Sequence, residues 1–153
     1  MPVQRPGPDP QPCGIASAVN VLGERWSFLI LRGAFFGLNH FEQFQAQLGI
    51  ARNILANRLA KLVEQGILER TLCADDRRKV LYTLTAKGEA LLPVLAALRQ
   101  WGDRWQVESG SGMILCDAQN RQPIQPMELR AADNRTLTLT DLVWVPREEL
   151  VQS

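Results

Sequence analysis

Residues 39–66 read NHFEQFQAQLGIARNILANRLAKLVEQG, and this stretch determines the expected fold. Phe41, Phe44 and Leu48 recur at three- and four-residue spacing, which predicts a short helix with one apolar face. Asn39, followed three residues later by Glu42, predicts a capping box that satisfies free amides at the start of that helix. The pattern therefore indicates a helix that begins immediately after Asn39.

A second helix is expected from residue 51 to residue 65, after a turn at Gly49. Its apolar stripe consists of Leu55, Leu59 and Leu62. Gly66 accepts the left-handed backbone that commonly ends a helix. Two short helices joined by a glycine-containing turn, the second longer and more basic, predict a helix-turn-helix.

The segment that follows changes from helical to strand-like patterning. Residues 67–73 and 79–84 are rich in apolar and β-branched side chains, which predicts two strands. The polar stretch 74–78 between them predicts a hairpin loop, so this unit is expected to be a wing. Thr85 is expected to cap a long helix in which Pro93 marks a bend or a break.

Two further helices are expected before residue 39. The first is marked by the helical spacing of Ile15, Ala18, Val19 and Leu22. Gly23 is expected to end it. Residues 25–36 are apolar on most sides, which predicts a helix buried at the centre of the domain.

Together these elements predict a mainly α fold with a small β wing, a winged helix-turn-helix over residues 13–108. Residues 1–12 contain five prolines and are expected to form a flexible arm. Residues 109–153 are expected to be a small β-rich appendage, with strands at 113–116, 124–129 and 142–145. So short a segment buries little core alone, so it should dock on the main domain or on a partner chain.

Composition restricts the classes of function. Apolar residues make up 46% of the 153 residues and charged residues 22%, as in ordinary globular proteins. The sequence contains no apolar run of membrane-spanning length and no secretion signal, so we expect a cytoplasmic protein with no membrane partner. Three widely spaced cysteines and one histidine predict neither a metal site nor any other cofactor. Cys73 and Cys116 are expected to be core residues.

Charge is distributed unevenly along the chain. Residues 52–105 carry ten basic and six acidic side chains, whereas residues 106–153 carry four basic and seven acidic ones. A basic segment in a chain whose other residues carry no net positive charge is typical of a surface that faces phosphate groups. A solvated basic face is the alternative explanation, and charge alone does not separate the two.

The candidate DNA-binding residues lie on the second helix of the pair and on the wing. One face of the helix carries Arg52, Asn53, Ala56 and Asn57, with Arg58 and Lys61 at its sides. Small residues allow close approach to base edges, and asparagine matches an adenine edge in the major groove. The wing carries Arg77, Arg78 and Lys79, whose cations suit phosphates or a narrow minor groove. The neighbouring aspartates are expected to orient an arginine.

Several spaced motifs resemble the HxlR family of bacterial transcriptional regulators, which are relatives of the MarR family. These motifs are Cys13-Gly14-Ile15, Gly23-Glu24-Arg25-Trp26, His40-Phe41-Glu42-Gln43-Phe44, Leu55-Ala56-Asn57-Arg58-Leu59, Gly66-Ile67-Leu68-Glu69-Arg70 and Tyr82-Thr83-Leu84-Thr85-Ala86-Lys87-Gly88. The resemblance spans residues 13–105. It implies a homodimer, more often a repressor than an activator, on a near-palindromic operator in double-stranded DNA, with tuning by a small-molecule effector or by oxidation.

The resemblance also implies roles for individual residues. The first and last helices of the domain would pack between subunits, through Ile15, Val19, Leu95, Leu98, Trp101 and Trp105. Cys13 occupies the position at which some members of the family sense oxidants, and a helix N-terminus favours a thiolate. Small apolar packing is the alternative role of Cys13.

Three positions depart from the family pattern at the expected DNA interface. His40 stands where arginine is usual, Ala51 stands where serine usually caps the second helix, and the wing lacks the usual prolines. His40 remains a candidate DNA contact. Two other functions are alternatives to DNA binding: a winged helix that binds protein, and an enzyme such as a thiol peroxidase. No nucleophile and base are paired in the sequence, so we expect no enzymatic activity.

Overall fold

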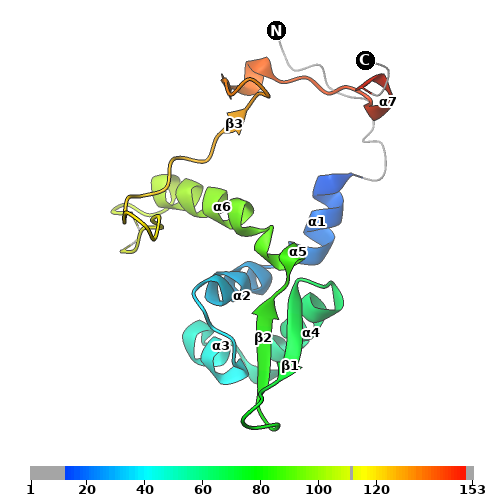
Figure 1. The fold of residues 1–153 in the computed structure, drawn as a ribbon, viewed down its shortest axis with the longest axis vertical. Helices are drawn as coiled ribbons and strands as arrows, with labels where there is room; N and C mark the ends of the chain where they lie inside the picture. The colour runs from blue at the N-terminus through cyan, green and yellow to red at the C-terminus, as the bar shows by residue number, and fades with distance from the viewer. Residues whose placement is uncertain (1–12, 111, 151–153) are drawn as a thin grey trace.

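The computed structural model describes residues 13–110 and 112–150 and forms a winged helix-turn-helix from which a C-terminal segment extends (Figure 1). Its main part consists of α1 (Gly14–Leu22), α2 (Arg25–Phe35), α3 (Phe41–Leu48), α4 (Arg52–Glu64), β1 (Leu68–Leu72), β2 (Val80–Leu84), α5 (Ala86–Glu89) and α6 (Leu92–Trp105). The predicted mainly α fold with a small β wing is therefore confirmed. Within the described residues, no helix combines the length and apolar character needed to cross a bilayer.

The core lies where α2, α3 and α4 meet the base of the wing. Its members include Ile30 and Leu31 from α2, Phe44 from α3, Leu55, Leu59 and Leu62 from α4, and Ile67 and Leu68. The stripe predicted for α4 is buried, because residues three and four apart lie on one face of a helix. The prediction that α2 is buried at the centre of the domain is confirmed only for the side of the helix that faces this core.

The turn between α3 and α4 depends on Gly49, whose φ of +62° is a left-handed conformation that favours glycine. The start of α3 differs from the prediction by one residue. His40, and not Asn39, precedes the helix, and the Gln43 side chain accepts hydrogen bonds from the amides of both residues, each at 3.1 Å. Gln43 therefore makes the return contact that was expected of Glu42.

The wing is an antiparallel pair whose register runs from Leu68 opposite Leu84 to Leu72 opposite Val80. Its second strand also reaches back to the start of α3. The amide of Tyr82 donates to the Asn39 carbonyl at 2.8 Å, next to an isolated bridge between His40 and Leu81. The wing is thus joined to the helix-turn-helix by the chain from α4 into β1 and by the contact of β2 with the start of α3.

The predicted long helix after the wing is divided in two. Thr85 caps α5 by accepting from the Gly88 amide, and its hydroxyl donates to the Gly66 carbonyl. A turn at Ala90 and Leu91 then separates α5 from α6. Pro93 lies in the first turn of α6, where its missing amide donor costs no hydrogen bond. The expected break at this proline is confirmed.

The three strands predicted for the C-terminal segment are wrong in position. The segment contains β3 (Leu129–Arg130), β4 (Thr136–Leu137), the 3-10 helix η1 (Leu139–Asp141) and α7 (Arg147–Leu150). Within the described part of the chain, residues 113–116 contribute only one bridge, from Cys116 to Pro123, and residues 142–145 have no strand neighbour. Two prolines within 122–126 lack amide donors and therefore interrupt a ladder there. Cys73 is half-buried, but Cys116 is exposed, so its predicted core role is wrong.

Glu24 links the start of α2 to α4. Its carboxylate accepts from the amides of Trp26 and Ser27 at 3.1 and 2.8 Å, and it forms an ion pair with Arg58 at 3.3 Å. Partial burial opposes ionisation. The hydrogen bonds from Ser27 and Trp26 and the charge of Arg58 outweigh that effect and hold the pKa of Glu24 below its ordinary value of 4.5.

Replacing Glu24 should therefore destabilise the domain in a pH-dependent way. Glu24→Ala removes a helix cap and should lower the free energy of unfolding by about 1–2 kcal/mol at pH 7. Because the folded-state pKa is depressed, the stabilisation is complete above pH 4.5 and is lost as the pH falls through the folded-state pKa. Urea unfolding across this range measures the difference.

The exposed Glu64 at the end of α4 provides the matched control. Glu64→Ala should change the free energy of unfolding by less than about 0.5 kcal/mol at every pH. A loss in Glu24→Ala that stays constant from neutral pH to below pH 4.5 would show that the carboxylate charge does not stabilise this junction.

Candidate nucleic-acid interface

The outward face of α4 is polar, small and unobstructed. Arg52, Asn53, Ala56 and Asn57 are all exposed, while the leucine stripe on the opposite face is buried. The helical period separates these two faces. Burial of the leucines therefore points the predicted recognition residues away from the domain.

Arg52 adjoins a groove between the start of α3 and the wing. Its guanidinium lies 4.6 Å from the centre of the Phe41 ring, a cation–π contact that limits where the side chain points. The groove has a volume of about 240 Å³ and is lined by His40, Phe41, Glu42, Arg52, Arg78, Lys79, Val80 and Tyr82. Candidate residues from the two helices and the wing thus converge on one surface.

The wing loop presents its cations in a defined arrangement. The Asp76 carboxylate accepts from the Arg78 amide at 3.0 Å and pairs with its guanidinium at 3.3 Å. The Arg78 side chain is nonetheless 93% exposed, and Arg77 and Lys79 are exposed as well. The loop aspartate therefore orients one arginine and leaves its charge open to solvent.

Arg58 lies apart from this surface. It is half-buried and paired with Glu24 at the start of α2, on the inner side of α4. Lys61 is also half-buried. The structure thus brings His40, Arg52, Arg78 and Lys79 to one groove and directs Arg58 elsewhere.

Four lining residues were absent from the sequence-based candidates: Phe41, Glu42, Val80 and Tyr82. Glu42 places an acidic group in the groove, beside His40 and Arg52. Tyr82 arrives from β2 because its amide is held by the Asn39 carbonyl. The strand pattern placed Tyr82 on the wing, but only the pairing with residue 39 brings it to the groove.

A second group of candidates forms apolar surface far from the groove. On α1, Ile15 and Val19 are exposed, and α1 buries only Leu22. On α6, Leu98, Trp101 and Trp105 are exposed, whereas Leu95 packs against the core. Cys13 lies at the start of α1 and is half-buried. Among the described residues, no three His, Cys, Asp or Glu side chains cluster as they would around a metal ion.

Comparison with known proteins identifies relatives of the winged helix-turn-helix. The HTH-type transcriptional regulator Rv3095 of Mycobacterium tuberculosis is 42% identical over 91 residues, covering 60% of this chain and 58% of the relative. This chain therefore spans less than two thirds of that relative's length. The HTH-type transcriptional regulator YodB of Bacillus subtilis is 36% identical over 90 residues, covering 58% of this chain and 80% of YodB.

Solved structures extend the likeness beyond α6. The crystal structure of PA1607, described as a candidate transcription factor, is 39% identical, with a TM-score of 0.84 over 90% of this chain and 96% of PA1607. PA1374 from Pseudomonas aeruginosa is 37% identical, with a TM-score of 0.61 over 92% of this chain and 99% of PA1374. Residues outside 13–108 make up more than a third of this chain. The score for PA1607 therefore requires that part of the C-terminal segment also superposes.

The family match covers most of the folded domain. Residues 21–109 match the model of the HxlR-like helix-turn-helix family, from the end of α1 to just beyond α6. This range includes the α3–α4 pair, the wing and the groove between them. The chain belongs to the HxlR-like helix-turn-helix family.

Proposed function

We propose that this protein is a DNA-binding transcriptional regulator, acting as a repressor, that binds a near-palindromic operator as a homodimer. The supporting observation is the convergence of His40, Arg52, Arg78 and Lys79 on one groove beside the exposed face of α4. The family match, the relatives that are HTH-type regulators and the basic charge of residues 52–105 support the same function. We place the protein in the cytoplasm.

In this proposal α4 enters the major groove and the wing contacts the flanking backbone. Asn53 and Asn57 would read base edges, and Ala56 would allow the helix to approach closely. Arg52, held over Phe41, and the wing cations would neutralise phosphates. Arg58 is reassigned from DNA contact to holding α4 against α2 through Glu24.

The homodimer would form through the exposed apolar surfaces of α1 and α6, in the domain assigned to residues 13–108. Helix α1 has nine residues, a length that is marginal for an isolated helix in water, and it buries only Leu22. Trp101 and Trp105 add a large aromatic surface one turn apart on α6. A two-fold dimer would cover both surfaces and present two copies of α4 to the operator.

Selection of bound duplexes from a random library tests the proposed function. We expect enrichment of a near-palindrome whose half-sites are centred about one helical turn apart, roughly 34–36 Å, or a multiple of it. Enrichment of a single asymmetric site would contradict the homodimer. Failure to enrich any duplex would contradict DNA binding and would favour a winged helix that binds protein.

Salt dependence of binding to the selected duplex separates the proposed phosphate contacts from the structural arginine. Arg77→Ala with Arg78→Ala should weaken binding and reduce the slope of log K against log salt by about 2, and Arg52→Ala should reduce it by about 1. Arg58→Ala, on the same helix as Arg52, is the matched control. It should lower stability and leave the salt slope unchanged. A salt slope that falls equally in Arg52→Ala and Arg58→Ala would contradict the assignment of Arg52 to phosphate contact and of Arg58 to a structural role.

We propose redox control through Cys13 as a second candidate function. YodB has been solved in a reduced form, after diamide treatment and bound to a quinone. Cys13 lies half-buried at the start of α1, beside the proposed dimer surface. A change at its thiol would therefore act on the packing of α1 and on the spacing of the two α4 helices. A small-molecule effector at this place would act by the same route.

Diamide and quinone provide a direct test of that control. Either compound should weaken binding of the wild-type protein to the selected duplex by about 5- to 150-fold, the range typical of coupled sites. Cys13→Ser should remove the response, whereas Cys116→Ser, at an exposed position in the C-terminal segment, should retain it. An undiminished response in Cys13→Ser would rule out sensing at this residue.

A further inference from the structure

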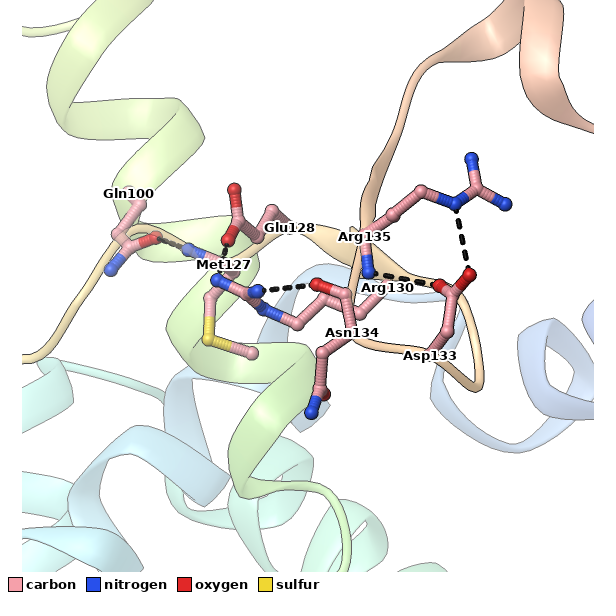
Figure 2. Close-up of polar contacts among 7 residues, drawn as sticks. All are labelled: Gln100, Met127, Glu128, Arg130, Asp133, Asn134 and Arg135. Atoms are coloured by element: carbon pink, nitrogen blue, oxygen red, sulfur yellow. Dashed lines mark hydrogen bonds and ion pairs between the residues drawn. The ribbon is translucent and has the colours of Figure 1, made fainter.

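The C-terminal segment is anchored on α6 before it leaves the domain. The Gln100 side chain donates to the Gln125 carbonyl at 3.1 Å. It also accepts from the Met127 amide at 2.6 Å (Figure 2). Arg99, which lies on the same helix as Gln100, donates to the Met113 carbonyl. Residues 113–127 therefore have a fixed attachment, and the chain beyond Met127 starts from a defined point.

Residues 128–150, which we call the C-terminal arm, have a defined local structure. The Arg130 guanidinium donates to the Asn134 carbonyl in the β3–β4 turn at 2.8 Å and pairs with Glu128 on its own side of the hairpin (Figure 2). Asp133 pairs with Arg135 at 3.0 Å in the turn. The Thr138 amide donates to Asp141 at 2.7 Å and starts η1. These contacts are local and polar, so they shape the arm without giving it a core.

The apolar side chains of the arm have no core to occupy. Every residue from 138 to 150 is exposed, and Trp144 is 71% exposed, more than Trp101 or Trp105. The other exposed large apolar residues of the arm are Leu129, Leu139, Leu142, Val143, Val145 and Leu150. Two-residue strands and a one-turn helix are too short to be stable alone in water. The arm therefore requires a surface that it does not itself provide.

The path of the arm limits where that surface lies. The arm leaves the C-terminal end of α6 and extends to the far side of α1, with α7 beyond the N-terminal end of α1 (Figure 1). Its own α6 already holds residues 113–127, with Ala96 and Gln100 facing Ile114, Leu115 and Ile124. The match to PA1607, with a TM-score of 0.84 over 90% of this chain, includes part of this C-terminal segment.

We infer that the C-terminal arm crosses to a second copy of this chain and packs its apolar side chains on the exposed surfaces of α1 and α6 of the partner subunit. The inference rests on the proposed homodimer and adds the exchanged arm to it. The arm begins where Gln100 of α6 holds residues 125–127, so its first residues lie beside the α6 surface proposed for the homodimer. Helix α1 carries no charged residue, so apolar side chains can cover it without burying a charge.

An exchanged arm would also explain how so short a helix as α1 is held in place. Residues 14–20 are all exposed in the single chain. The arm of the partner subunit would cover α1 from the side opposite α2, and the two-fold axis would repeat that contact. Each dimer would then be joined by two arms in addition to the α1 and α6 surfaces.

Isotope-mixed crosslinking of the full chain tests this exchange. Trp144 is replaced with p-benzoylphenylalanine, and dimers are formed from equal amounts of ¹⁴N- and ¹⁵N-labelled protein and then irradiated. We expect crosslinked peptides that join one isotope to the other, with the partner end in residues 14–22 or 92–105. The same amino acid at Leu72, an exposed apolar position on the wing, should give no mixed-isotope crosslinks. Arm crosslinks confined to one isotope, or none, would overturn the inference.

A second measurement uses conventional variants of the full chain. Val143→Ser with Trp144→Ser should raise the dimer dissociation constant, measured by sedimentation, at least about tenfold, since interface tryptophans carry much of the binding energy. Arg147→Ala, an exposed charge in α7, should leave it within about twofold. A dimer that both variants leave unchanged would overturn the arm exchange alone. A wild-type chain that stays monomeric at every concentration would overturn the homodimer as well.

Discussion

The packing of the α4 leucine stripe against α2 is the contact on which the rest of the structure depends. Leu55, Leu59 and Leu62 are buried together with Ile30 and Leu31, so the rotation of α4 about its own axis is fixed. That rotation points Asn53 and Asn57 outward and turns Arg58 toward Glu24. The Glu24–Arg58 pair then adds a polar contact beside an interface that apolar burial has already formed. A substitution in the core would therefore shift the proposed recognition surface even when every residue on that surface stays the same.

The groove beside α4 depends on a second, longer-range contact. The backbone hydrogen bond from Tyr82 to Asn39 brings the wing beside the start of α3, and only then do Arg78 and Lys79 lie close to Arg52. Backbone bonds of this kind are insensitive to side-chain identity, so the geometry of the groove tolerates change in the residues that line it. His40 in place of arginine therefore alters the charge of the groove while its frame is kept.

Local patterns were sufficient to predict the helices and the wing, because the periods of helices and strands can be recognised within a few consecutive residues. The order of elements from Gly14 to Trp105, the turn at Gly49 and the break near Pro93 follow from spacing and backbone chemistry alone. What needed the structure were contacts between distant residues. The capping role of Gln43 was missed because Glu42 and Gln43 are adjacent in the sequence. Which of them accepts from the amides of residues 39 and 40 depends on the residue at which the helix begins. The partner of Arg58 lies 34 positions earlier in the chain, and no local pattern connects Arg58 with Glu24.

The C-terminal segment was least predictable for a related reason. Its strands were expected from apolar runs at 113–116, 124–129 and 142–145, but an apolar run becomes a strand only where a neighbouring strand pairs with it. Residues 142–145 have no such neighbour within the described chain and remain extended and exposed. Their apolar character is then explained by contact with another molecule, and in the proposed homodimer a second copy offers the exposed apolar surfaces of α1 and α6. The same surfaces that would join two copies of α4 on an operator would thus also hold the arms.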